Sequence, residues 1–165
     1  MLSPASRVVQ STMLINLGVK LNHLNGALLH MVLLHDDSNY AFIEPMRNKS
    51  DDEMKRAYLA ILKCTQDAKL TICKHVLDNE CSMAMRQLIT KTCKYELVPP
   101  GCHRRNRTEV TIKSVKQHLT SVFAGLDHAF PMTHWDKLLP QIEVTLNLLR
   151  TSKAKPNSSA YEHVH

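Results

Sequence analysis

Apolar residues in the first third of the chain form short continuous runs separated by turn residues. The three runs span residues 12–21, 27–34 and 40–45. Asn25-Gly26 separates the first two, the polar stretch DDSN separates the second from the third, and Pro45 ends the third. Runs of this kind between Gly, Asn, Asp and Pro are typical of strands. The short connections predict an antiparallel meander.

The period of the apolar positions then changes to that of a helix. Ser50 followed by Glu53 forms a capping box, which predicts a helix start. Its apolar face is predicted to be Met54, Ala57, Tyr58, Ile61 and Leu62. Next come a predicted strand at 69–77, a helix at 82–92 and a strand at 94–98. The helix at 82–92 is predicted to face inward through Met85, Leu88 and Ile89.

Two helices are predicted in the last third of the chain. A long one begins at about Asn106, with an apolar stripe of Ile112, Val115, Leu119, Val122, Phe123 and Leu126. The last spans 132–150, with an inward face of Trp135, Leu138, Leu139, Ile142, Leu146 and Leu149. We expect Pro140 to kink it and residues 151–160, TSKAKPNSSA, to form a polar tail.

This order of elements predicts an α/β fold. Three meander strands running into β-α-β units give a mixed five-stranded sheet of order 3-2-1-4-5, with strand 2 antiparallel and helices flanking the sheet. A ribonuclease-H-like domain has this order. We expect an irregular N-terminus at 1–11, the domain at 12–150 and a truncated C-terminal tail of the core at 151–165. Ligands in such sheets gather at strand ends where connections change direction.

The composition of the chain limits the class of protein, the partners and the compartment that we expect. With 165 residues, 44% of them hydrophobic, the chain fits one domain with a real core and excludes a disordered tail. The formal charge of +6 and a pI of about 9.1 favour polyanionic partners. Five widely spaced cysteines argue against a disulfide framework or a zinc site, and they favour a reducing compartment. No membrane-spanning run or signal-peptide core is present, so we expect a nuclear or cytoplasmic protein.

Two carboxylates stand at positions where chemistry could occur. Asp78 closes the fourth predicted strand, and Glu109 begins a polar stripe of the long helix that continues through Lys113, Lys116 and Thr120. Converging carboxylates can hold a hard divalent cation such as Mg²⁺, and the lysines could engage phosphates. Alternatively, Asp78 caps a turn and Glu109 pairs with Lys113. Spacing alone favours this second interpretation.

Histidines and aromatic residues give weaker signals. We expect His30, His35 and His75 to be packed or surface residues rather than metal ligands, and His103 to be a loop residue. Trp135 is expected to anchor the last helix. Aromatic residues make up 5% of the chain, which argues against recognition of single strands by base stacking.

Four segments carry a resemblance to a known family. They are LLHMVLLHDDSNYAFIEPMRNKS, LDNECS, YELVPPGCHRRNRTEV and HWDKLLPQIEVTLNLLRTSKAKPNSSAYEHVH. In these segments the chain resembles the integrase catalytic core of copia-like retrotransposons, over roughly residues 12–165. The most specific parts are LVPPGCHRRNRTE and the helix from the tryptophan to LNLLR. The family's fold is ribonuclease-H-like, in agreement with the predicted element order.

The resemblance implies a D-D-E triad that binds Mg²⁺ or Mn²⁺, trims the DNA ends of the element and joins them to target DNA. Asp78 matches the second carboxylate and Glu109 the third, which makes both catalytic and metal-binding candidates. The implied DNA-binding residues are Arg104, Arg105, Arg107, Lys113 and Lys116. Relatives assemble as multimers on DNA, so DNA and further copies of the chain are the implied partners.

The first carboxylate of the triad is missing. Residues 12–21 contain no Asp or Glu, and Asn16 is the nearest match. Asp36 and Asp37 are expected to be ordinary turn residues at the opposite end of the strand pair. We therefore expect a degenerate integrase core that keeps its fold and some DNA affinity and loses roughly a thousandfold in rate. The alternatives are an active polynucleotidyl transferase, a non-catalytic nucleic-acid-binding remnant or domesticated domain, and a folded remnant without a selected function.

Overall fold

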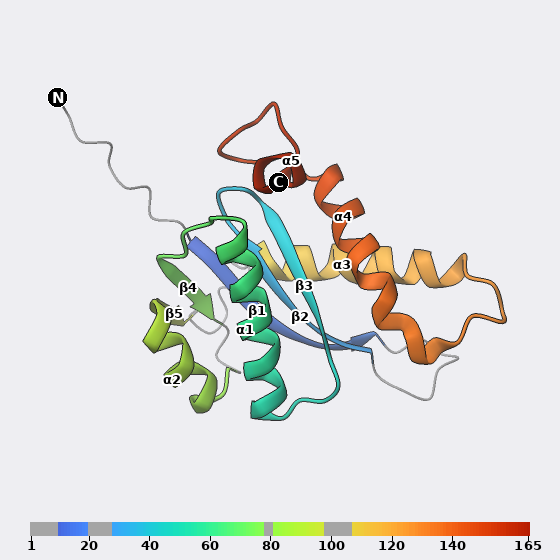
Figure 1. Ribbon diagram of the computed structural model, residues 1–165, viewed down its shortest axis with the longest axis horizontal. Helices are drawn as coiled ribbons and strands as arrows, with labels where there is room; N and C mark the ends of the chain where they lie inside the picture. Colours follow the sequence, from blue (N-terminus) through green and yellow to red (C-terminus); the bar gives the residue numbers. More distant parts are fainter. Residues whose placement is uncertain (1–9, 20–27, 78–80, 98–106) are drawn as a thin grey trace.

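The computed structural model describes residues 10–19, 28–77, 81–97 and 107–165, with 10–19, Leu28, Arg107 and Thr108 described by their backbone alone. The strands are β1 Gln10–Val19, β2 Leu28–His35, β3 Tyr40–Met46, β4 Lys74–Leu77 and β5 Lys94–Leu97 (Figure 1). The helices are α1 Asp51–Asp67, α2 Met83–Thr92, α3 Arg107–Ala124, the 3-10 helix η2 Met132–Leu138, α4 Leu139–Leu149 and α5 Ala160–Val164.

The five strands form one sheet in the order β3-β2-β1-β4-β5, which is the order predicted from the sequence. β2 is antiparallel to both β1 and β3, whereas β4 is parallel to β1 and β5 is parallel to β4. β4 is shorter than the predicted strand at 69–77, because the backbone bonds that close α1 run through Lys69 and Leu70. Only Lys74–Leu77 pair with β1.

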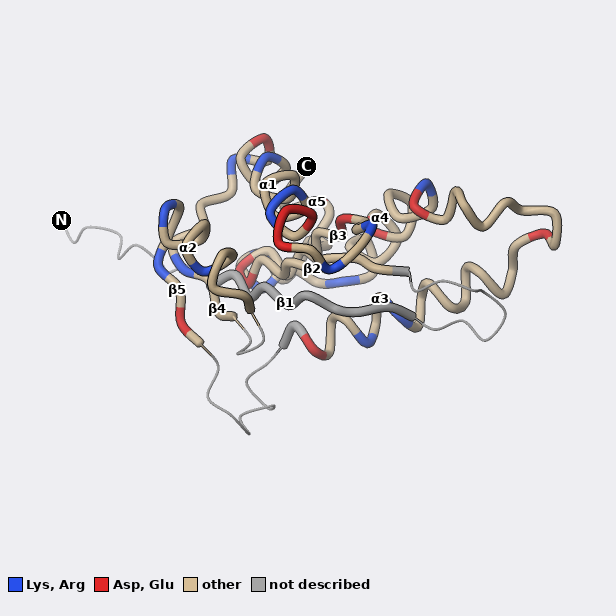
Figure 2. The backbone as a smooth tube through the Cα atoms, turned by 90° about the horizontal axis from the view of Figure 1, so that it is seen from below, with Lys and Arg blue, Asp and Glu red and all other residues tan. Residues whose placement is uncertain are grey.

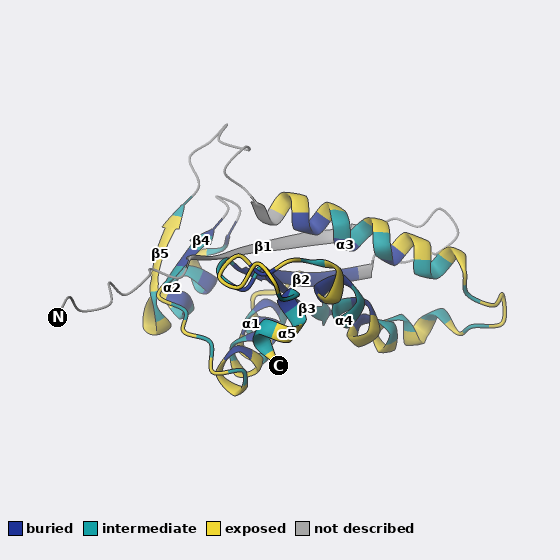
Figure 3. Ribbon diagram, turned by 90° about the horizontal axis from the view of Figure 1, so that it is seen from above, coloured by how far each residue is buried: buried dark blue, intermediate teal, exposed yellow. Residues whose placement is uncertain are grey.

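Two clusters of buried side chains sit on opposite faces of the sheet. The first joins β2 and β3 to α1, α2 and α5 through residues such as Met31, Phe42 and Tyr58. The second joins Val32 and Ile43 to α3 and α4. Figure 3 shows α3 lying across its own face of the sheet, with buried and exposed positions alternating along it. Alternation along β2 explains the division, since successive strand residues point to opposite faces.

Most of the residues that were predicted to face inward from α1, α2 and α3 are buried. Met54, Ala57, Tyr58, Ile61, Met85, Ile89, Ile112, Val115 and Leu119 are buried. The capping box at Ser50 is only half formed. Ser50 accepts from the Glu53 N–H, but the Glu53 carboxylate accepts from the backbone N–H of Arg47 and pairs with Arg56. The Glu53 carboxylate therefore ties the end of β3 to α1 and does not cap its own helix.

The last helix differs from the prediction in two respects. Residues 132–138 form the 3-10 helix η2, and the α-helix begins at Leu139, with Pro140 in its first turn. Proline is tolerated there because its missing N–H needs no partner in the first turn, so no kink inside the helix is required. Leu149 was predicted to face inward but is 78% exposed, whereas Asn147 is fully buried.

The segment after α4 is not the polar tail expected from the sequence. Thr151 and Ser159 form a β-bridge, and Ser159 and Glu162 form a complete capping box at the start of α5. Ala160 is fully buried in the cluster that contains Phe42 and Tyr58. Asp36 forms an ion pair with Lys153, and the carbonyl of Asp37 accepts from the backbone N–H groups of Lys153 and Ala154. The segment is thus part of the domain.

Candidate active site and nucleic-acid interface

The parallel strands β1 and β4 run side by side and end toward the same edge of the sheet. Their last pair is Met13 with Leu77. Asp78 follows Leu77 directly in the sequence and lies outside the described residues, so its predicted role stays a prediction. Ligand sites of open α/β sheets form at such carboxyl ends. This edge is where the sequence places the second acid of the triad.

β1 itself supplies no acid to this edge. None of its ten residues is Asp or Glu. Asn16, the nearest match to the missing acid, pairs with His30 of β2 and lies three positions beyond Met13. The next position of β1 after the last β1–β4 pair is Leu14. The register therefore places Leu14, and not Asn16, directly after the last β1–β4 pair.

Asp36 and Asp37 lie at the other end of the sheet. They follow His35, which pairs with Ser11 near the start of β1. Their turn contacts the segment that follows α4. Asp36 forms an ion pair with Lys153, and the carbonyl of Asp37 accepts from the backbone N–H groups of Lys153 and Ala154. The expectation that they are turn residues at the opposite end of the strand pair is confirmed by this position.

α3 presents the predicted polar residues on its outer side. Glu109 and Lys113 are exposed and Lys116 is half-buried, which places Lys116 at the border of the core. In Figure 2 the acidic stretch of α3 lies at its start and basic stretches follow it. Among the residues that the structure describes, neither Lys113 nor Lys116 takes part in an ion pair. The simple pairing of Glu109 with Lys113 is thus not the observed arrangement.

The remaining predicted DNA-binding residues precede or begin this helix. Arg107 is the first residue of α3, and its backbone alone is described. Arg104 and Arg105 lie outside the described residues, as does His103. Their contribution to DNA binding stays a prediction.

Arg150 fixes the start of α3, and sequence reasoning did not identify it. Its guanidinium donates to the carbonyl and the side-chain oxygen of Asn39, at 2.8 and 2.7 Å, and to the hydroxyl of Thr111 at 3.1 Å. Thr111 is buried and stands two residues after Glu109. One planar guanidinium therefore joins the β2–β3 turn, the end of α4 and the first turns of α3.

Replacing Arg150 by alanine should lower the free energy of unfolding by about 2 kcal/mol, because bonds to a charged donor are lost and a buried hydroxyl loses a partner. Arg150→Lys should recover less than half of this loss, since an ammonium lacks the planar fork. Urea denaturation of the three proteins measures both effects. Equal stability of Arg150→Lys and the wild type would contradict the role of the fork.

α4 covers the outer edge of β3 with two polar side chains. Asn147 accepts from the N–H of Ala41 and donates to its carbonyl, at 2.8 and 2.9 Å. The Glu143 carboxylate accepts from the N–H of Ile43 at 2.8 Å and from the Tyr40 hydroxyl at 3.0 Å. Figure 1 shows α4 beside β3. These side chains complete the hydrogen bonds of an edge strand that has no further neighbour.

The burial of Glu143 has an electrostatic consequence. Desolvation raises the pKa of its carboxyl from 4.5 to about 7, although the bonds from Ile43 and Tyr40 act in the other direction. Burial, followed by the charge of Glu143, raises the pKa of the Tyr40 hydroxyl as well. Because a carboxyl with a pKa near 7 is partly protonated at neutral pH, the contact between α4 and β3 depends on pH.

His30, His35 and His75 are packed side chains, as expected. His30, His35 and His75 are all at most 3% exposed. Burial lowers the pKa of His75 to about 4, so its ring is neutral at pH 7. Within 10–19, 28–77, 81–97 and 107–165, no group of three His, Cys, Asp or Glu side chains could hold a metal ion. β1 contributes no Asp or Glu to such a group.

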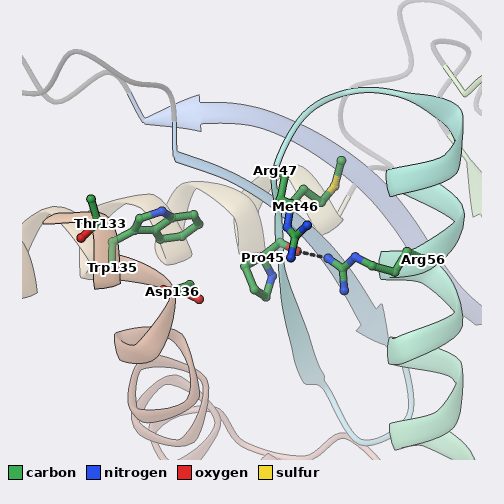
Figure 4. A pocket seen from close by; sticks show the side chains of 7 residues that line it. All are labelled: Pro45, Met46, Arg47, Arg56, Thr133, Trp135 and Asp136. Atoms are coloured by element: carbon green, nitrogen blue, oxygen red, sulfur yellow. Dashed lines mark hydrogen bonds between the residues drawn. The ribbon is translucent and has the colours of Figure 1, made fainter.

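A cavity of about 430 Å³ lies between the end of β3, α1 and η2 (Figure 4). Arg47 and Arg56 line one side, and Trp135 and Asp136 line the other. Trp135 also packs against the cluster of α3 and α4, which fits its predicted role as an anchor. The Arg56 guanidinium is already engaged with Glu44, Glu53 and the carbonyl of Pro45. Of the predicted site residues whose side chains the structure describes, Glu109, Lys113 and Lys116, none lines this cavity.

None of the described helices is long and apolar enough to cross a membrane.

Comparisons by sequence find no relatives, since no family model and no curated protein matches the chain. Comparison with solved structures does find similar proteins. The magnesium complex of the HTLV-2 integrase catalytic core domain, in its trimeric form, matches with a TM-score of 0.71 at 13% identity, over 96% of this chain and 97% of that chain. The BIV integrase catalytic core domain matches with a TM-score of 0.64 at 13% identity, over 94% and 92%.

A third match comes from a larger assembly. A chain of the simian T-cell lymphotropic virus intasome in complex with the PP2A regulatory subunit B56 gamma has a TM-score of 0.72 at 14% identity, over 96% of this chain and 54% of that chain. At such identities the likeness is one of fold. The chain has the fold of retroviral integrase catalytic cores, which is the ribonuclease-H-like fold expected from the sequence.

Proposed function

We propose that the chain is a degenerate integrase catalytic core of copia-like retrotransposon type, which binds DNA and has lost most of its end-trimming and joining activity. The observation that supports this best is the carboxyl end of β4 beside β1, together with α3, which contacts β1 and carries Glu109 and two lysines, in a sheet of order β3-β2-β1-β4-β5. The likeness in fold to retroviral integrase cores supports the proposal.

The proposed roles follow from side-chain chemistry. Lys113 and Lys116 contact DNA phosphates with Arg104, Arg105 and Arg107, and such contacts give affinity without sequence preference. Asp78 and Glu109 are the two carboxylates that could hold Mg²⁺ or Mn²⁺, with an affinity weakened by the missing third. A metal would supply Lewis-acid chemistry when bound. Arg150 acts as a positioning residue, because it holds the turn of α3 that follows Glu109.

The named relatives suggest what assembles around this core. The HTLV-2 integrase core is described as a magnesium complex in trimeric and dimeric forms, and the simian T-cell lymphotropic virus protein is part of an intasome. We extend these features to this chain as part of the proposal: a divalent cation as cofactor, and DNA and further copies of the chain as partners.

Neutralising the two lysines should weaken DNA binding. Because each phosphate contact releases counterions, the Lys113→Gln, Lys116→Gln double variant should bind a short duplex roughly tenfold or more weakly near 0.1 M salt. The slope of log K against log salt should fall by about 2 in magnitude. Fluorescence anisotropy over a salt series measures both quantities.

A matched control is available on the far side of the domain. Lys63 and Lys69 are exposed residues of α1 and the turn after it, so their double Gln variant removes the same charge. It should bind DNA like the wild type. Equal losses in the two double variants would show that net charge and not the α3 face governs binding. Absence of binding by the wild type would favour a remnant without function.

A second candidate function is a purely DNA-binding domain. The lack of any acid in β1 favours it, since binding needs only the fold and the basic face of α3. In that case DNA affinity would be unchanged in Glu109→Gln and unaffected by Mn²⁺. A metal-dependent gain in affinity that Glu109→Gln abolishes would favour the integrase-type site instead.

A further inference from the structure

Two cysteines stand at equivalent positions, each one residue before one of two neighbouring strands. Cys73 immediately precedes β4 and Cys93 immediately precedes β5, and the first pair of the parallel β4–β5 ladder is Lys74 with Lys94. The cysteines continue this register by one position. Neighbouring strands are about 4.8 Å apart, which lies within the Cα separation of about 4.4–6.8 Å that a disulfide spans. Paired positions also point to the same face of a sheet.

The surroundings of the two thiols differ. Cys73 is exposed, whereas Cys93 is half-buried and packs against the core that contains Tyr58. Burial raises the pKa of the Cys93 thiol, and the charge of Cys73 acts in the same direction. The hydroxyl of Thr92 and the backbone N–H of His75 donate to the Cys93 sulfur and act in the other direction. Cys73 is therefore the thiol that a reagent meets first.

Small molecules can also reach this end of the sheet. A cavity of about 270 Å³ is lined by Cys93, by Thr71 and Ile72 just before Cys73, and by His75 and Thr92. It provides room beside the Cys93 thiol. Of the other described cysteines, Cys81 is buried in the core and Cys64 is exposed on α1, and neither stands at a strand pairing.

We propose that Cys73 and Cys93 are an oxidisable dithiol that low-molecular-weight disulfides such as oxidised glutathione convert to an intramolecular disulfide. The Cys73 thiolate attacks one sulfur of oxidised glutathione, and one glutathione thiolate leaves. The Cys93 thiolate then attacks the Cys73 sulfur of the mixed disulfide and releases the second glutathione. Two protein thiols lose two electrons and two protons, and one oxidised glutathione becomes two reduced molecules.

The bond would secure the outermost strand of the sheet. β5 has four residues, and among the described strands it pairs with β4 alone. A disulfide at its first position closes the chain from Cys73 to Cys93, which contains β4 and α2. Oxidation should therefore raise the midpoint of thermal unfolding by roughly 5–10 °C. This inference does not depend on the proposed function, because it concerns the end of β4 opposite to Asp78.

Peptide mapping of the intact chain tests the proposal. The protein is incubated with oxidised glutathione under native conditions, alkylated, digested without reduction and measured by mass spectrometry. Before alkylation and digestion we expect an intact monomer that is lighter by about 2 Da, the mass of two hydrogen atoms, and after digestion one cross-linked peptide pair that joins Cys73 to Cys93. Reduction should reverse both changes and the thermal shift.

Single variants supply the controls. Cys93→Ser should trap glutathione on Cys73 as a stable mixed disulfide, whereas Cys64→Ser should still form the cross-link. A stable glutathione adduct on Cys73 of the wild type would overturn the proposal, because it would show that Cys93 does not resolve it. A cross-link through Cys64 or Cys102, or between two chains, would overturn it as well.

Discussion

One aspartate placed on β1 should restore metal-dependent DNA joining to this chain by roughly a thousandfold, the effect of about 4 kcal/mol of transition-state stabilisation. The prediction rests on the proposed function. β1 contains no carboxylate, so a site built on Asp78 and Glu109 lacks one charge for its cation. Leu14→Asp is the variant that the strand register favours, because Leu14 follows the last β1–β4 pair. Asn16→Asp tests the match made from the sequence.

The two variants differ in where they deliver their charge. Asn16 lies two residues beyond Leu14, or about 7 Å along the strand. Carboxylates that share a divalent cation must bring their oxygens within about 2.0–2.6 Å of it. We therefore expect Leu14→Asp to rescue activity and Asn16→Asp to rescue it less. End trimming and strand transfer with Mn²⁺, on a duplex carrying the terminal sequence of the parent element, measure both variants.

Controls separate a restored site from a change in folding. Glu109→Gln in the Leu14→Asp background should abolish the gain, whereas Asp52→Asn on α1 should leave it intact. Circular dichroism and DNA binding verify that each variant folds. Activity in the wild type that Glu109→Gln removes would show that another group replaces the missing acid. No gain in either folded β1 variant would contradict a recently disabled integrase.

Much of the fold could be predicted because its signals are local. The strand order of the meander follows from its short turns, and α1 and α3 follow from apolar residues at helical spacing, such as Met54, Tyr58 and Ile61. The start of β4 could not be placed in this way. Residues 69–73 are apolar enough for a strand, but backbone bonds to the end of α1 engage Lys69 and Leu70, and only Lys74–Leu77 find a partner strand.

The candidate site shows the same division between local and long-range signals. Glu109 and the lysines of α3 share a helix, so the sequence predicts that they share a face. Arg150 could not be predicted, because its partners Asn39 and Thr111 are far from it in the sequence. The relation of β1 to β4 is likewise a tertiary property. Only the register shows that Leu14, and not Asn16, directly follows the last β1–β4 pair.

Replacing Glu143 by glutamine should make the protein more stable at pH 8 and leave its stability unchanged at pH 4. In the folded chain the pKa of the Glu143 carboxyl is raised from 4.5 to about 7, mainly by burial. Below pH 4.5 both folded and unfolded chains hold the proton. As the pH rises toward 7 the unfolded chain releases it first, so folding loses about 3 kcal/mol, and this loss is complete above pH 7.

Glutamine resembles the protonated carboxyl and can keep both contacts. Its carbonyl oxygen can accept from the Ile43 N–H, and its amide can donate to the Tyr40 oxygen. Urea denaturation from pH 4 to 8 should therefore show a difference between variant and wild type that is near zero at pH 4 and grows through pH 5–7. Asp136→Asn, which changes an exposed carboxylate near η2, should follow the wild type at every pH.

A second substitution tests the cause of the shift. The Tyr40 hydroxyl donates to Glu143 and lowers the pKa of its carboxyl. Tyr40→Phe removes this donor, so the pKa should rise further and the loss of stability should extend to higher pH. A Glu143→Gln protein that differs from the wild type by the same amount at pH 4 and pH 8 would contradict this account. It would mean that Glu143 is ionised over that whole range and that its bonds to Ile43 and Tyr40 outweigh its desolvation.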